Sequence, residues 1–228
     1  MNNPNLSIKQ IFTSSFAIYE KHFFPLFGVS LLIVLLNFPV NWLLSLEDNH
    51  LKLVGVLMAP VIFMVSLLFF SVLIVSLDQT TKGESVDLKV SFKQSLGVFW
   101  GYLCCSMITG LIIGLGFLLL IIPGLYLTII FFFAPYFILL DGKQTSAALK
   151  ESKRIVKGNM AQICKIYGLI ILMVMPVLGL TVLIQKVTYG AVACILLLVI
   201  NVVLASLWPF IAAVFYNLFI QLKKASSN

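Results

Sequence analysis

Four basic residues at helical spacing are the strongest candidates for binding chemistry in this sequence. The segment TSAALKESKRIVKGN carries them: Lys150, Lys153, Arg154 and Lys157. In a helix the apolar Leu149 and Ile155 turn to another side. Near a membrane surface, each Lys or Arg attracts anionic lipid by about 1 kcal/mol. The run therefore predicts a site for lipid headgroups. The alternative is that these charges only hold their loop on one side of the membrane.

The residue patterns of common enzymes and metal sites are missing from the sequence. It contains no G-x-S-x-G, H-E-x-x-H or phosphate-binding P-loop motif. The four cysteines lie in apolar sequence without a C-x-x-C pair, namely Cys104, Cys105, Cys164 and Cys194. His22 and His50 fall on opposite sides of the membrane in the topology derived below. We therefore expect no catalytic residue, no cofactor or metal ligand, and no enzymatic activity.

The composition is that of an integral membrane protein. The chain has 228 residues, of which 61% are hydrophobic and 10% charged, and its mean hydropathy is +1.10. Soluble domains carry about 25% charged residues, so this chain has too little polar surface for water. The net charge of +7 is explained by the connections between spans. No nucleic-acid-binding motif accompanies it, so we expect no nucleic acid partner.

Apolar length predicts an all-α, polytopic fold with a single membrane domain over residues 1–228. Its six transmembrane helices are expected at about 24–46, 54–77, 98–122, 125–140, 161–184 and 191–222. Proline inside several of them is tolerated because neighbouring helices can satisfy the carbonyl groups it leaves unpaired. The spans contain no Asp, Glu, Arg or His. This argues against an ion-coupled transporter, which usually needs such groups at depth.

Basic residues are distributed very unevenly over the connections between these spans. All but Lys52 and Lys186 of the 15 Lys and Arg residues lie at the termini, after the second and fourth spans or, in the case of Lys165, near the cytoplasmic end of the fifth span. Basic residues accumulate in cytoplasmic connections. The count therefore predicts an even number of spans with both termini in the cytoplasm.

Three amphipathic segments precede the first, third and fifth spans, at about 7–22, 87–96 and 145–157. They are too short and too polar to span, so we expect three short helices at the cytoplasmic membrane surface. When they are aligned on Ser15, Ser95 and Ser152, an aliphatic residue follows three positions later in each. The alignment indicates three repeated units, each a surface helix with a helical hairpin. Chance similarity between amphipathic helices is the alternative.

Pro123 and Gly124 interrupt an apolar run that extends from residue 97 to 140. As one helix, this run would measure about 66 Å, roughly twice the hydrocarbon core of the membrane. The pair is therefore predicted to form the hairpin turn between the third and fourth spans. Only about 24 Å of helix follows the pair, so either a full-length or a sunken hairpin is compatible with the sequence.

Small and polar residues inside the spans predict contacts between helices. Gly110, Gly114 and Gly116 form a G-x-x-x-G pattern with one further glycine, which favours close packing within the molecule over dimerisation. The polar residues at depth are Asn37, Asn41, Asn201 and Asn217. We expect these amides to form hydrogen bonds between helices; a path for a polar substrate is the alternative.

The region Leu118–Gln162 carries a further pattern. Ile122-Pro123-Gly124 is followed about ten residues later by Ala134-Pro135, and then by an S-x-R segment ending at Asn159. The pattern resembles the YciC-type family of uncharacterised bacterial inner-membrane proteins. It is also similar to the membrane domains fused to some glycerophosphodiester phosphodiesterases. The resemblance implies a six-span protein of the bacterial inner (plasma) membrane, tied to envelope homeostasis. It implies no catalytic residues, and this chain lacks any phosphodiesterase domain.

The leading functional hypothesis is a non-enzymatic protein that acts in envelope or lipid homeostasis by binding membrane lipids, anionic ones in particular, or a protein partner. The scarcity of reactive groups and the three basic surface segments motivate it. The competing hypothesis is a transporter or lipid translocator with a cavity between broken helices. A membrane enzyme is the third, and a cluster of convergent polar side chains around a pocket would favour it.

Overall fold

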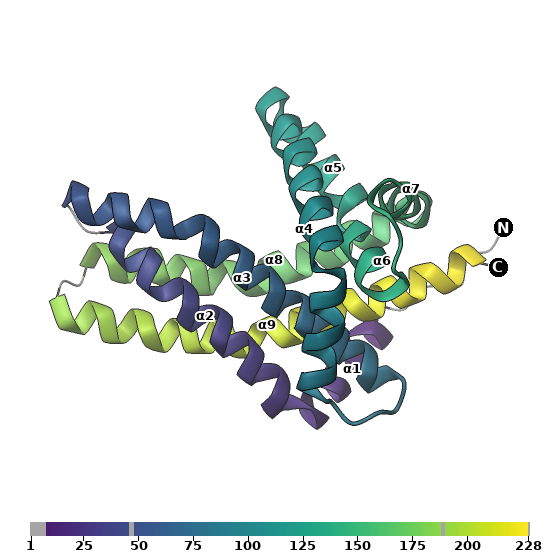
Figure 1. The fold of residues 1–228 in the computed structure, drawn as a ribbon, viewed down its shortest axis with the longest axis horizontal. Helices are drawn as coiled ribbons and strands as arrows, with labels where there is room; N and C mark the ends of the chain where they lie inside the picture. The colour runs from purple at the N-terminus through teal and green to yellow at the C-terminus, as the bar shows by residue number, and fades with distance from the viewer. Residues whose placement is uncertain (1–7, 46–47, 188–189, 228) are drawn as a thin grey trace.

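The computed structural model describes residues 8–45, 48–187 and 190–227, and all its regular elements are helices (Figure 1). They are α1 (Ile8–Lys21), α2 (Phe23–Ser45), α3 (Asn49–Thr81), α4 (Leu88–Leu119), α5 (Ile121–Phe131), α6 (Ala134–Asp141), α7 (Thr145–Val156), α8 (Met160–Val187) and α9 (Gly190–Ser227). The predicted all-α class is confirmed.

Six segments are long and apolar enough to cross a membrane, as the sequence predicts. They are Phe23–Leu44, Asn49–Thr81, Leu88–Leu119, Ile121–Asp141, Met160–Ile184 and Ile195–Ser226. The protein is therefore a multi-pass membrane protein. The predicted helix ends at Ser7 and Leu46 lie outside the described residues.

The amphipathic segment at 87–96 is not a separate helix, which corrects the sequence prediction. It forms the first turns of α4, so the surface segment and the third span are one continuous helix. The Asp87 carboxylate caps its start by accepting from the amides of Lys89 and Val90 at 2.9 and 3.3 Å. Because Gly97 alone only weakens a helix, nothing in this stretch ends it. By contrast, α1 and α7 are separate helices; their place at the membrane surface stays a prediction.

The chain reverses at Leu120, three residues before the predicted turn. Leu120 is extended, with φ −162° and ψ 154°, and separates α4 from α5. Pro123 and Gly124 belong to the first turn of α5. The hairpin turn predicted at these two residues is therefore wrong. The reason is that proline fits a first helical turn, where its missing N–H would have no partner.

Glycine is required where α4 and α5 approach each other. A Cβ atom on Gly124 would lie 2.5 Å from Cγ of Phe117, and one on Gly116 would lie 2.7 Å from Cδ1 of Leu127. Cβ atoms on Gly110 and Gly114 would have no neighbour within 4 Å. The close contact between helices is therefore made by Gly116. The sequence-based prediction that Gly110 and Gly114 pack closely within the molecule is wrong.

The fourth span consists of two helices, α5 and α6, separated by Phe132 and Phe133 just before Pro135. Together they provide 21 residues, or about 32 Å of helix. This matches the roughly 30 Å core, so the span is long enough for a full-length hairpin.

Two groups of spans diverge in Figure 1. Helices α2, α3, α8 and α9 run side by side, whereas the α4–α5 hairpin projects away from them. The tip of that hairpin is apolar and open, with Leu118 82% and Ile122 81% exposed. Such surfaces are stable only against lipid or another apolar partner. The α7 helix lies beside the junction of the two groups, and the C-terminal end of α9 extends beyond it, to the right in Figure 1.

Partly buried amides join some of the helices. The Asn37 amide donates to Ser66 Oγ at 2.7 Å and links α2 to α3. The Asn217 amide donates to Ser15 Oγ at 2.7 Å and links α9 to α1. These two predicted inter-helix bonds are confirmed, whereas the Asn201 amide donates to Leu197 O in its own helix.

The three serines of the proposed repeat are all fully buried. Ser15 accepts the hydrogen bond from α9, and Ser152 donates to Ile130 O at 2.6 Å and ties α7 to α5. Ser95 Oγ has no hydrogen-bond partner among the described residues. The shared burial is compatible with three related units, although the partners differ. The repeat stays a prediction.

Candidate functional site

The end of α6 sets the position of the charged residues nearby. Gly142 has a positive φ of 62°, and its amide donates to Ile138 O at 3.1 Å. The amide of Lys143 then donates to Phe137 O at 3.2 Å. A left-handed residue with these two bonds is a common helix end, and glycine adopts it without strain. This turn places Lys143 opposite α7 and the last turns of α9.

A cleft of about 360 Å³ lies between α6, α7 and the end of α9. We call it the basic cleft. Its charged lining residues are Lys143, Glu151, Arg154, Lys223 and Lys224. Four cations therefore surround the cleft with one carboxylate in its lining.

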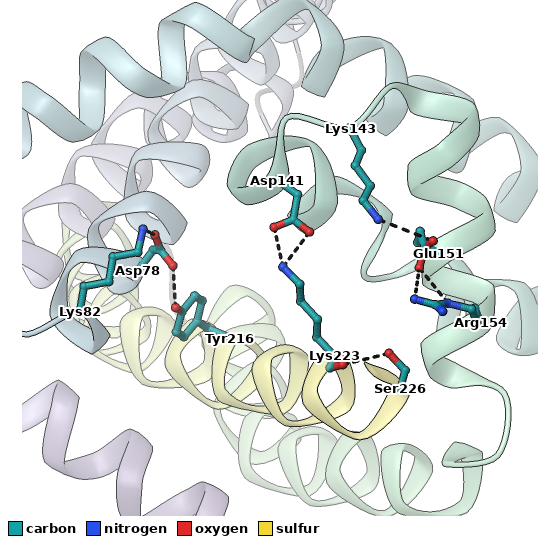
Figure 2. A network of polar contacts seen from close by, with 9 residues as sticks. All are labelled: Asp78, Lys82, Asp141, Lys143, Glu151, Arg154, Tyr216, Lys223 and Ser226. Atoms are coloured by element: carbon teal, nitrogen blue, oxygen red, sulfur yellow. Dashed lines mark hydrogen bonds and ion pairs between the residues drawn. The ribbon is translucent and has the colours of Figure 1, made fainter. Parts of the chain in front are cut away.

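Ion pairs hold Lys143, Glu151, Arg154 and Lys223 in place (Figure 2). Arg154 Nε and Nη2 lie 2.9 and 2.7 Å from Oε2 of Glu151, and Lys143 Nζ lies 3.6 Å from its other oxygen. Lys223 Nζ donates to both oxygens of Asp141 at 2.6 and 2.8 Å. When Asp141 is included, the described residues of the region are four cations and two carboxylates, which gives them a net positive charge.

Two of the lysines also lie near aromatic rings. Lys143 Nζ is 4.9 Å from the ring centre of Phe137, and Lys223 Nζ is 5.9 Å from that of Phe219. The negative face of a ring attracts a cation at such distances. Since the Lys143, Lys223 and Arg154 side chains are 33%, 42% and 59% exposed, an anion in solution can reach them.

A second polar contact fastens α9 to α3 close by. The hydroxyl of the buried Tyr216 donates to Asp78 Oδ1 at 2.8 Å and lies 2.8 Å from Thr81 Oγ1. Lys82 pairs with the same carboxylate, and this hydrogen bond raises the pKa of Lys82 above its usual value, although partial burial opposes the shift. Figure 2 shows both α9 anchors, Tyr216 and Lys223. The end of α9 is thus positioned from two sides.

The structure divides the predicted headgroup site. Arg154 lines the basic cleft, whereas Lys150, Lys153 and Lys157 are exposed residues outside its lining. The division follows from α7 packing, because its buried face consists of Ala148, Ser152, Ile155 and Val156. Sequence reasoning missed Lys143, Lys223 and Lys224 as site residues. Their only signal was membership in the basic cytoplasmic set.

A second cavity, of about 500 Å³, has an apolar lining. We call it the apolar cavity; its walls come from α3, α8, α9 and the α5–α6 junction, and include Phe70, Phe132, Tyr136, Tyr167, Val174 and Trp208. It shares no lining residue with the basic cleft. The fully buried Phe219 stands between them, with ring-centre distances of 5.4 Å to Tyr136 and 5.0 Å to Phe137.

Within the described ranges, no group of three or more His, Cys, Asp or Glu side chains is placed to hold a metal ion. Comparison of the chain with models of protein families, with characterised proteins and with solved structures found no match. The resemblance to the YciC-type family therefore stays a prediction, and the function is argued from the site.

Proposed function

We propose that this membrane protein binds the headgroups of anionic lipids in the basic cleft, and that it acts in lipid or envelope homeostasis without catalysing a reaction. The observation that carries the proposal is the excess of cations around the cleft. Lys143, Arg154, Lys223 and Lys224 lie around it, and the described carboxylates paired with them are Glu151 and Asp141.

The chemistry of these side chains suits a phosphodiester or phosphate group. The planar guanidinium of Arg154 can donate two parallel hydrogen bonds to phosphate oxygens. The lysines add positive charge without a fixed geometry. The volume of about 360 Å³ lies at the small end of the usual range for ligand pockets, which fits a headgroup and not a whole lipid.

The proposal includes the orientation in the membrane. We propose that the cleft and both termini face the cytoplasm of a bacterium, because basic residues accumulate on that side. A C-terminal fusion to green fluorescent protein should then fluoresce in cells, and a fusion to alkaline phosphatase should be inactive. An active phosphatase fusion would refute this orientation.

The direct test compares two triple variants of equal charge change. The cleft variant is Lys143→Gln, Arg154→Gln and Lys224→Gln, and its matched control is Lys150→Gln, Lys153→Gln and Lys157→Gln. Reconstituted protein is titrated with spin-labelled phosphatidylglycerol and phosphatidylcholine to obtain the ratio of their association constants. We expect the cleft variant to lower this ratio about tenfold, since three cations near a surface contribute roughly 3 kcal/mol before the carboxylates offset part of it. The control should lower it less than threefold.

Equal losses in the two triple variants would contradict the proposal, because they would show unspecific attraction by surface charge. An unchanged ratio in the cleft variant would contradict it as well. Thermal unfolding in detergent establishes that both variants are folded before the ratios are compared.

A lipid translocator is the second candidate, and the apolar cavity favours it. The aromatic barrier at Phe219 weighs against it, because it stands between the cavity and the cleft. A fluorescent phospholipid in proteoliposomes, bleached from outside by dithionite, distinguishes the two candidates. Complete bleaching would support translocation, and bleaching of only the outer leaflet would support binding.

A further inference from the structure

The apolar cavity follows α8 over a limited length. Its lining residues on this helix run from Tyr167 to Leu178, which corresponds to about 16 Å of helix. One leaflet of the hydrocarbon core is about 15 Å deep, half of its full thickness. The cavity is thus as long as one leaflet is deep.

Two tyrosines of the cavity wall have hydroxyl groups without a hydrogen-bond partner among the described residues. The Oη atoms of Tyr136 and Tyr167 are buried and form no hydrogen bond with any described residue. Tyr216 differs, because its buried hydroxyl bonds to Asp78 and lies within hydrogen-bond distance of Thr81. A buried hydroxyl without an acceptor is destabilising, and phenylalanine would fill the same space. The unpaired hydroxyls therefore point to an acceptor that is brought by a ligand.

Both hydroxyls lie near one end of their spans. Tyr136 is five residues before Asp141, and Tyr167 is seven residues after Met160, which places them about 8 and 10 Å along the helices from these ends. The polar layer of a leaflet is roughly 5–8 Å thick outside the hydrocarbon core. The two tyrosines therefore fall close to the level at which the ester groups of a glycerolipid enter the core.

The lining and the volume restrict the occupant. Water is disfavoured because an apolar cavity gives it too few hydrogen-bonding partners. A single extended hydrocarbon chain has the required length and width.

We propose that the apolar cavity holds one acyl chain of a glycerolipid from the cytoplasmic leaflet, whose ester carbonyl accepts hydrogen bonds from Tyr136 and Tyr167. The chain enters from the membrane along α8, where the lining residues Ile171 and Met175 are 51% and 59% exposed. This site is separate from the basic cleft and does not depend on the headgroup charge.

A photoactivatable lipid tests the proposal on the full chain in vesicles. The probe is phosphatidylcholine with a diazirine in the middle of one acyl chain, and cross-linked peptides are identified by mass spectrometry. Cross-links should concentrate on the parts of α8 and α9 that line the cavity. Val174→Trp, which fills the cavity from α8, should lower them at least fivefold. The matched control Leu172→Trp on the exposed side of α8 should leave them unchanged.

The double variant Tyr136→Phe and Tyr167→Phe tests the hydroxyls without altering the shape. With a probe that carries its diazirine beside the ester, the number of cross-links to α6 and α8 should fall at least threefold. With a probe labelled at the chain end, most of the cross-links should remain. A diazirine fatty acid that competes with the phospholipid probe at equal concentration would instead assign the cavity to free fatty acids.

Cross-links spread evenly over all lipid-exposed helices, or labelling that Val174→Trp leaves unchanged, would overturn the proposal. So would equal labelling of the double tyrosine variant by the ester-side probe. Because the probe is zwitterionic, the triple cleft variant should retain full labelling. The experiments can therefore refute the proposal for the basic cleft and the proposal for the apolar cavity independently of each other.

Discussion

The basic cleft and the apolar cavity meet at adjacent residues of α6, since Phe137 lines the cleft and Tyr136 lines the cavity. Their chemistry is opposite. In the cleft, Lys143 and Arg154 have Glu151 as counterion and stay partly exposed. In the cavity, the polar atoms of Tyr136 and Tyr167 are buried and unpaired among the described residues. The difference is the basis of our two proposals, which assign headgroup charge and acyl chain to separate parts of one small bundle.

Removing the barrier between the two regions should have the largest effect. Phe219→Ala deletes a fully buried ring at the contact of α9 with α6, and we expect the free energy of unfolding to fall by about 3–5 kcal/mol. Unfolding by SDS in mixed micelles measures it. Phe24→Ala is the matched control, because Phe24 is 84% exposed. A loss below about 1 kcal/mol in Phe219→Ala would show that the barrier is not part of a packed core.

The partnered tyrosine should matter more than the unpartnered one. Tyr216→Phe removes the hydrogen bond to the Asp78 carboxylate, and bonds to charged groups contribute about 1.5–3 kcal/mol. The same SDS titration should show a loss in this range. Tyr126→Phe on the exposed surface of α5 is the control and should change almost nothing. Equal free energies of unfolding for Tyr216→Phe and Tyr126→Phe would show that Tyr216 does not anchor α9.

Asp141→Asn should separate stability from lipid selection in the cleft. It removes the counterion of Lys223, so unfolding becomes easier by about 1 kcal/mol, as for partly exposed ion pairs. The cleft gains one unit of positive charge, and the preference for phosphatidylglycerol over phosphatidylcholine should rise. A decreased preference, measured with the spin-labelled lipids, would mean that Asp141 orients the binding side chains.

The smallest effect is expected at Tyr136. Because its buried hydroxyl has no partner within the described residues, Tyr136→Phe should not lower the free energy of unfolding in lipid-free micelles and should raise it by at most about 1 kcal/mol. A loss as large as that of Tyr216→Phe would reveal an internal hydrogen bond, and the hydroxyl would then not be available to a lipid.

Local sequence patterns were sufficient for the helical fold and the six spans. Their errors also have local causes. The turn was placed at Pro123-Gly124 because proline and glycine usually interrupt helices, yet proline is tolerated in the first turn of α5. Gly124 serves the packing against Phe117 instead. A residue that breaks helices in general can thus begin one.

The candidate sites depend on contacts that no local pattern shows. The helical run of basic residues identifies Arg154 from sequence. It does not identify Lys223, which also lines the cleft and is held by Asp141, a residue 82 positions away in the sequence. Lys150 and Lys153 have the same spacing signal and remain outside the lining. The hydroxyls of Tyr136 and Tyr167 are likewise left unpaired by the packing of α6, α8 and α9. The apolar sequence around these two residues does not predict this.

One measurement tests the separation of the two regions most directly. Spin-labelled phosphatidylglycerol and phosphatidylcholine are compared in the wild type, the triple cleft variant and Val174→Trp, and both the preference ratio and the number of immobilised lipids are recorded. We predict that the cleft variant lowers the ratio about tenfold at a constant number. Val174→Trp should lower the number by about one lipid at a constant ratio. If either variant changed both quantities together, the two regions would form one site and the account would be contradicted.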